Sequence, residues 1–211
     1  VNCAGTSSSA EFVDTSSDEF VRLYAANVLT AVHATKATLP LMRPRGGGRI
    51  CIISSQAGQT GIWGFSAYSA SKFALRGFAE VLQMENKPYN IYVSVNFPPD
   101  TDTPGFEHEN LTKPELTRLL SETSGLFKPD QVADAVLRGI TRATFQSSVG
   151  IDGFMLSNLT AGMSPFNNLW EVTLQVLFAS LFRFISLFYV ADFDSRVKAY
   201  HVKQQQQQQQ R

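Results

Sequence analysis

Two short apolar runs interrupt an otherwise mixed pattern of hydrophobic and polar positions in the first 150 residues. Residues 50–55, ICIISS, and residues 91–97, IYVSVNF, are rich in β-branched side chains. Such runs are typical of strands that are buried on both faces of a parallel sheet. Residues 1–5, VNCAG, indicate a strand end followed by a glycine turn, and residues 147–152, SSVGID, indicate one more short strand.

Segments with helical spacing separate these strands. Ser16 and Glu19 have the spacing of a capping box, and apolar positions continue with helical periodicity to about Met42. A second helix is expected from the small-residue stretch at 64–80 to about Lys87. Two more are predicted where a proline stands near the N-terminus of the segment, a position at which its missing N–H costs no hydrogen bond; they cover residues 113–122 and 128–143.

This alternation of strands and helices predicts an α/β fold, the C-terminal part of a Rossmann-like doubly wound parallel sheet. Ligands of such sheets bind outside the carboxyl ends of the strands. The loops at 2–5, 54–61 and 97–105 are therefore where functional residues are expected.

The C-terminal quarter has a different pattern. In residues 174–191, LQVLFASLFRFISLFYVA, 14 of 18 positions are apolar and one is charged. Three interpretations are open: a helix packed in the core or at a dimer contact, a helix lying in a membrane interface, or a membrane span, for which the length is marginal. We therefore divide the chain into a catalytic domain at 1–152, an apolar helical segment at 153–200 that associates with membranes, and a disordered glutamine-rich tail at 201–211.

Composition excludes some classes of function. Lys and Arg number 18, as do Asp and Glu, and the basic residues are scattered, so a nucleic-acid partner is not expected. The three histidines lack metal-ligand spacing, and no metal site is predicted. Cys3 and Cys51 lie in apolar runs, which favours buried thiols over a disulfide. Because the chain starts without Met at the end of an apparent strand, we expect that an N-terminal part precedes it.

Tyr68 and Lys72 stand four residues apart at the start of a predicted helix, so both side chains lie on one face. One interpretation is that the lysine charge lowers the pKa of the phenol; the other is a solvated pair of amphipathic side chains. Ser55 ends the preceding strand and lies at the same sheet edge. Asn27 is a mid-helix amide that is either functional or satisfied by solvent.

In order and spacing, NCAG, Asn27, ISS with Ser55, and YSASK with Tyr68 and Lys72 resemble the short-chain dehydrogenase/reductase family, over residues 1 to about 105. The glycine-rich dinucleotide loop of that family would lie upstream. The resemblance implies that Tyr68 is the general acid and that Ser55 orients the substrate carbonyl. It also implies that Lys72 lowers the pKa of the phenol and holds the nicotinamide ribose, and that Asn27 holds a water linking Lys72 to solvent.

The same resemblance implies further cofactor contacts from the loops after the strands, in addition to those of Tyr68 and Lys72. They are Asn2, Ala4, Gly5 and Pro98. Pro98 is followed by Pro99 where the family usually has glycine, which stiffens the loop. Asp100 and Asp102 in this loop are interpreted as turn residues rather than as a catalytic carboxylate pair.

The stretches SSQAGQTGIWGFSAYSASKFALRG, MENKPYNIYVSVNFPPDTDTPGF, TKPE and DGFMLSNLTAGMSP are similar to one branch of this family. Its members use NADPH to reduce 3-ketosphinganine to sphinganine in sphingolipid synthesis, at the endoplasmic reticulum membrane with the active site facing the cytosol. The resemblance thus implies a long-chain keto-lipid substrate, contact with membrane lipid, and a homo-oligomer through helices at about 20–42 and 67–87.

Two alternatives remain at this point. A related short-chain reductase would act on a steroid, retinoid or fatty acyl carbonyl with the same serine, tyrosine and lysine. A polypeptide that keeps only this part of the fold would be inactive and would have only a binding role.

Overall fold

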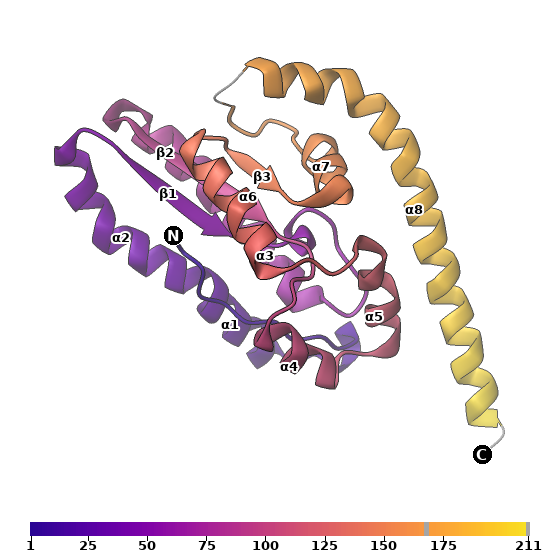
Figure 1. The fold of residues 1–211 in the computed structure, drawn as a ribbon. Coiled ribbons are helices and arrows are strands. Elements are labelled where there is room, and N and C mark those ends of the chain that lie inside the picture. Colours follow the sequence, from indigo (N-terminus) through magenta and orange to yellow (C-terminus); the bar gives the residue numbers. More distant parts are fainter. Residues whose placement is uncertain (167–168, 210–211) are drawn as a thin grey trace.

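A computed structural model of the chain describes residues 1–166 and 169–209, and its sheet has three parallel strands in the order β1-β2-β3 (Figure 1). These are β1 (Gly48–Ile53), β2 (Ile91–Phe97) and β3 (Gln146–Ser148). Ile50 pairs with Val93 of β2, and Val95 pairs with Gln146 of β3. Parallel neighbours need crossover connections, and helices supply both of them.

Helix α3 (Ser66–Asn86) connects β1 to β2, as its sequence predicts. The connection from β2 to β3 contains three helices, α4 (Pro104–Thr112), α5 (Glu115–Ser121) and α6 (Pro129–Thr141). Two helices follow β3: α7 (Gly150–Leu159) and the long α8 (Leu169–Gln209). Short 3-10 turns occupy Phe12–Asp14, Arg43–Arg45, Gln56–Gly58, Lys87–Tyr89 and Glu122–Ser124.

The N-terminal residues extend the sheet beside β1. The Asn2 amide donates to the Cys51 carbonyl at 2.7 Å, and the Ile53 amide donates to the Asn2 carbonyl at 3.0 Å. This isolated parallel bridge between Asn2 and Ile52 confirms a strand end at the start of the chain. The turn that follows therefore leaves the sheet at the carboxyl end of the strands, next to the loop after β1.

The two faces of the sheet differ in chemistry. On one face the alternate residues of β2, from Ile91 to Phe97, form the core with Leu75 and Ala79 of α3. On the other face Asn96 donates to the Cys51 sulfur at 3.0 Å and accepts from Ser147. Both faces are buried, as predicted, but the second face is polar because every other residue of β2 is polar.

One continuous helical stretch runs from residue 17 to residue 42. Helix α1 (Ser17–Tyr24) begins where the Ser16 hydroxyl accepts from the Glu19 amide at 3.2 Å, which confirms the predicted cap. A π-helical turn (Ala25–Leu29) joins α1 to α2 (Thr30–Met42). The periodicity did not predict this turn, which fits one extra residue into the helix.

Other differences from the sequence expectations lie in the second half of the chain. Helix α4 was not predicted, because its segment has no apolar stripe. The strand expected at 147–152 ends at Ser148, and α7 begins at Gly150 and runs through the expected domain boundary at 152. The tail was expected to be disordered, but residues 201–209 continue α8, since glutamine is a good helix former. The division into domains stays a prediction.

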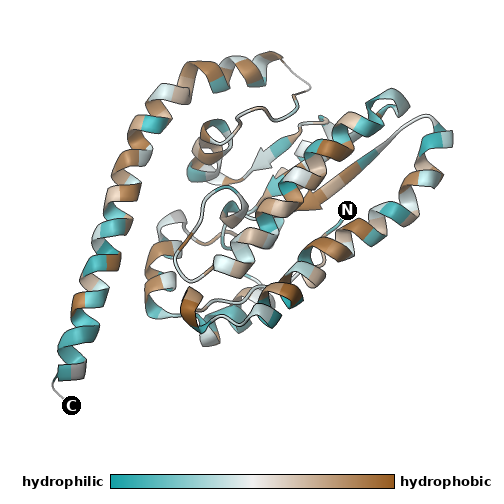
Figure 2. Cartoon of the chain, turned by 180° about the vertical axis from the view of Figure 1, so that it is seen from behind, coloured by the Kyte–Doolittle hydropathy of each residue, from teal (hydrophilic) through white to brown (hydrophobic). Residues whose placement is uncertain are grey.

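Helix α8 lies along one side of the molecule and leaves most of its apolar surface uncovered (Figures 1 and 2). Phe182 packs edge-on against Phe154 of α7, with ring centres 5.9 Å apart, and Tyr200 contacts Trp63 at 6.2 Å. Its most apolar 18-residue window is only 6% buried, and Leu169–Gln207 is long and apolar enough to cross a membrane. The interpretation of this segment as a buried core helix was therefore wrong.

Candidate active site

A cavity of about 660 Å³ opens at the carboxyl ends of β1 and β2. The loop after each strand forms part of its wall, and the Gln56 amide donates to the Pro98 carbonyl at 3.1 Å, which ties the two loops together. Five of the predicted residues line it: Gly5, Ser55, Tyr68, Lys72 and Pro98. The site thus lies where the topology of a parallel sheet predicts it.

Tyr68 and Lys72 project into this cavity from the first turns of α3. The Lys72 ammonium lies 5.6 Å from the centre of the Tyr68 ring and donates to the Ile53 carbonyl at 3.2 Å. Burial lowers the pKa of Lys72 from 10.5 to about 8. Ser55 hydrogen-bonds with Tyr68. The predicted serine, tyrosine and lysine therefore meet in one place, and the interpretation as a solvated pair was wrong.

The pKa of Tyr68 differs from the expectation. Burial raises it, the hydrogen bond with Ser55 opposes that effect, and the charges of Glu109 and Asp100 raise it further. The expected lowering by Lys72 is not found, because burial of the phenol dominates and two carboxylates lie near it. Tyr68 therefore holds its proton firmly at neutral pH.

Asn27 is buried inside the π-helical turn. Its side-chain oxygen accepts from the Thr6 amide, and its side-chain nitrogen donates to the Ser71 hydroxyl, each at 2.8 Å. Asn27 thus links the turn after Asn2 to helix α3, and the solvent-satisfied interpretation was wrong. Because both polar atoms of the amide are engaged, the expected water link to Lys72 stays a prediction.

Gly5 fits this arrangement because it has no side chain. A Cβ atom there would lie 2.8 Å from the Asn27 side-chain oxygen and 3.6 Å from the Lys72 ammonium nitrogen. The first distance is too short for a real contact, so any larger residue would displace the turn or the amide. This requirement gives the glycine of NCAG a physical reason.

Two predicted cofactor residues do not line the cavity. The Asn2 side chain donates to the Thr35 hydroxyl at 3.3 Å, and Ala4 is exposed. Cys3 was expected to be buried but is exposed at the cavity wall, because the chain leaves the sheet after residue 2. Cys51 is buried as predicted, and burial raises the pKa of its thiol to about 11.

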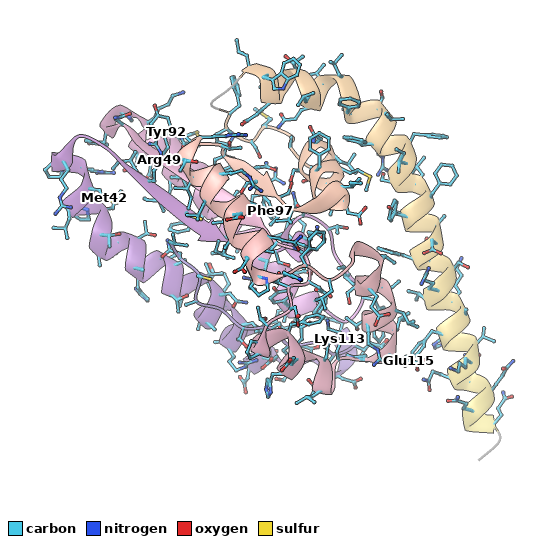
Figure 3. All side chains as sticks on the ribbon, viewed as in Figure 1. Met42, Arg49, Tyr92, Phe97, Lys113 and Glu115 are labelled. Carbon is cyan, nitrogen blue, oxygen red and sulfur yellow. The ribbon has the colours of Figure 1, made fainter. Side chains whose placement is uncertain are left out.

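The sequence analysis missed an acidic wall of the cavity, formed by Asp100 and Glu109. A Glu109 oxygen lies 2.6 Å from the Lys113 ammonium, its other oxygen accepts from Ser7, and an Asp100 oxygen lies 3.9 Å from Lys113. Lys113 stands between α4 and α5 (Figure 3), 99% of its side chain is buried, and its charge lies 4.8 Å from the Phe106 ring centre. The i, i+4 spacing of Glu109 and Lys113 was a usable signal, but it required α4 to be predicted.

Comparison with known proteins identifies the family. Residues 1–114 match the family described as short chain dehydrogenase, and the chain belongs to that family. It is also similar to a solved short-chain dehydrogenase from Sphingobium yanoikuyae in complex with NADPH, with 26% identity and a TM-score of 0.58. That similarity covers 69% of this chain and 54% of the other.

Two curated relatives share 52% identity with the chain. One is the 3-dehydrosphinganine reductase of Danio rerio, matched over 98% of this chain and 62% of its own length. The other is the 3-ketodihydrosphingosine reductase of Bos taurus, matched over 94% of this chain and 60% of its own length. The chain thus spans about three fifths of the length of these relatives.

Proposed function

We propose that the protein is an enzyme that reduces 3-ketosphinganine to sphinganine with NADPH, as a step of sphingolipid synthesis. The observation that carries the proposal is the meeting of Ser55, Tyr68 and Lys72 in one cavity of a chain 52% identical to two reductases named for this reaction. The exposed apolar surface of α8 adds support, because it suits an enzyme whose substrate has a long hydrocarbon tail.

The residues present fit a nicotinamide cofactor. A lysine ammonium has three donors, and among the residues that the structure describes Lys72 donates one hydrogen bond, to the Ile53 carbonyl. Its other donors can bind ribose hydroxyls. Gly5 and Pro98 border the same space and bring backbone close to it. When bound, the cofactor supplies the hydride that reduces the substrate carbonyl.

The side chains then handle the proton and the position of the carbonyl. Ser55 donates to the carbonyl oxygen and holds it near the phenol. Tyr68 gives its proton to that oxygen as negative charge develops there, and its raised pKa keeps the proton available at neutral pH. The positive charge of Lys72 stabilises the phenolate that remains. Asn27 holds the turn at Gly5 and Thr6 against α3 and so fixes the geometry.

We also propose that α8 attaches the protein to the endoplasmic reticulum membrane, with the cavity on the cytosolic side. The helix presents Leu177, Phe184 and Phe188 outward, each 59–65% exposed. Trp63, in the loop that also carries cavity residues, contacts Tyr200 of α8, so a lipid has a short apolar path to the site. Both cysteines are free thiols, which suits the reducing cytosol.

A homo-oligomer through α1 and α3 is the last part of the proposal. An apolar groove of about 420 Å³ lies between these helices, lined by residues such as Phe20, Val21 and Ala70. Val21 is 68% exposed and Tyr24 47%. Such a face is suited to packing against the same face of a second copy.

The decisive experiment is NADPH oxidation by the full-length protein in membranes, with 3-ketosphinganine as the substrate. Tyr68→Phe should lower kcat by about 10²- to 10⁴-fold, because the proton donor is lost, while NADPH still binds. Tyr92→Phe is the matched control, since Tyr92 stacks on Arg49 at 4.4 Å at the other end of the strands (Figure 3). Equal turnover by Tyr68→Phe contradicts the proposed role, and preference for a steroid ketone favours the other branch of the family.

A further inference from the structure

We infer that Asp100 binds the protonated amino group of the substrate, and that this contact selects a 2-amino ketone over other long-chain ketones. This inference rests on the proposed function. Reduction of a ketone by hydride and proton transfer needs no carboxylate, yet Asp100 and Glu109 both line the cavity that holds Tyr68. A keto-sphingoid base differs from a plain long-chain ketone in carrying an amino group on the carbon next to the carbonyl.

The charge in the acidic wall leaves room for one more cation. Glu109 and Lys113 form a close pair at 2.6 Å, and Ser7 donates to the second oxygen of Glu109. Asp100 lies 3.9 Å from the same lysine, a longer contact than a hydrogen bond, and it also accepts from Ser121. Three charged groups thus carry two negative charges and one positive charge. Asp100 has the acceptor capacity that remains, because a carboxylate can accept about four hydrogen bonds.

The distribution of charge also separates the two ligands. The phosphates of a dinucleotide are anionic, so an acidic wall is an unfavourable place for the cofactor. Lys72, on α3, provides the positive charge that suits the cofactor. The substrate is then left with the side of the cavity that carries Asp100, and its ammonium group is complementary to that side.

Asp100 also lies at a suitable depth. It follows Pro98 and Pro99 directly after β2, and the Asp100 carbonyl accepts from the Phe127 amide at 3.0 Å, which fixes the backbone. Its charge is felt at Tyr68, so an ammonium beside Asp100 and a carbonyl beside Tyr68 can belong to one small head group. The rigid position is what selectivity between closely related ketones requires.

The test compares two substrates and two variants of the full-length protein in membranes. The substrates are 3-ketosphinganine and the same hydroxy-ketone with hydrogen in place of the amino group. The wild type should favour the amine by about 10- to 100-fold in kcat/KM, the usual effect of a hydrogen bond to a charged group. Asp100→Asn should remove this preference, mainly through KM, and should leave the deaminated ketone unaffected.

Asp102→Asn is the matched control, because Asp102 makes the same chemical change two residues away, is exposed, and is not among the cavity-lining residues. Asp100→Asn leaves the Glu109–Lys113 pair neutral as a unit, so the variant should fold, which its thermal unfolding will show. An equal loss of kcat/KM for both ketones with Asp100→Asn overturns the inference, since the carboxylate would then be structural.

Binding of the product supplies a readout independent of turnover. Sphinganine should raise the melting temperature of the wild type more than its deaminated analogue does, and Asp100→Asn should abolish the difference. If neither ketone is reduced by the wild type, the proposed function fails, but amine-dependent stabilisation that requires Asp100 would still support the contact. If the two ligands stabilise the wild type equally, the inference is wrong whatever the turnover.

Discussion

Lys72 keeps an ammonium group where burial opposes its charge. Only 6% of the residue is exposed, and its pKa is lowered from 10.5 to about 8. The folded protein therefore releases this proton at a lower pH than the unfolded chain does. A bound dinucleotide with acceptors for the free donors of Lys72 would offset part of the cost of burial.

This shift predicts how stability depends on pH. Between about pH 8 and pH 10 the unfolded chain binds more protons at Lys72 than the folded protein does, so the free energy of unfolding should rise with pH, by on the order of 2 kcal/mol. Above pH 10 the raised pKa of Tyr68 acts in the opposite direction. Denaturant titrations of the cofactor-free protein across this range measure the rise.

Lys72→Met should remove that rise, and the exposed Lys36→Met should retain it. An unchanged slope in Lys72→Met would show that Lys72 titrates normally and that its burial is not maintained in solution.

Residue types and spacing predicted Ser55, Tyr68, Lys72 and Gly5 correctly as neighbours, because strand ends and helix faces fix where they lie. Asp100 was noticed but interpreted as a turn residue. Its place in the cavity wall depends on Lys113 and Glu109, which come from a helix that the hydrophobic pattern did not predict. The engagement of Asn27 with Thr6 and Ser71 likewise depends on long-range packing.

At the scale of elements, α8 stands apart from the rest because its apolar side chains face outward. Phe184 and Phe188 pack edge-on against each other and are 59% and 63% exposed. The sequence predicted an apolar helix but left its surroundings open, since periodicity alone cannot distinguish a core helix from a membrane helix. Burial in the structure decides against the core.

Replacing Phe184 and Phe188 by aspartate should weaken membrane association at least tenfold, because each charge costs about 2 to 3 kcal/mol in a bilayer. Flotation with liposomes measures the bound fraction. Aspartate at Gln206 and Gln207, which are exposed near the polar end of the same helix, should have little effect. Undiminished flotation of the double phenylalanine variant would contradict a membrane role for this face of α8.

Prediction of elements succeeded where hydrophobic pattern and end signals agree. The strand at 91–97 was predicted at both ends, and α3 within about two residues. It failed for α4, in which polar residues, a capping threonine and an N-terminal proline replace an apolar stripe. The local sequence also did not mark the π-helical turn, which the contacts of Asn27 accompany.

At the scale of the whole molecule, the uncovered faces decide how copies of the chain could meet. The apolar face of the sheet is covered by α3 and the polar face by α6. The groove between α1 and α3 remains open on the outside. Single side chains do not reveal this groove, because it exists only once the two helices have packed together.

Val21→Glu combined with Phe73→Glu should dissociate the proposed oligomer, since both side chains are exposed and apolar, at 68% and 43%. Light scattering of the detergent-solubilised protein measures the mass. Leu137→Glu, at an exposed position of α6, is the control and should leave the mass unchanged. An oligomer that survives the double change must form through another surface.

The π-helical turn between α1 and α2 has a consequence for changes in chain length. Leu23 and Val28, five residues apart, are both buried, whereas a regular α-helix would place them about 140° apart around its axis. Deleting one residue from 25–29 would rotate one half of the helix by about 100° and carry either Leu23 or Ala31 out of the core. The turn at Gly46 and Gly47 is exposed and imposes no such coupling. Insertions and deletions accumulated over evolution are therefore expected at the second place and not at the first.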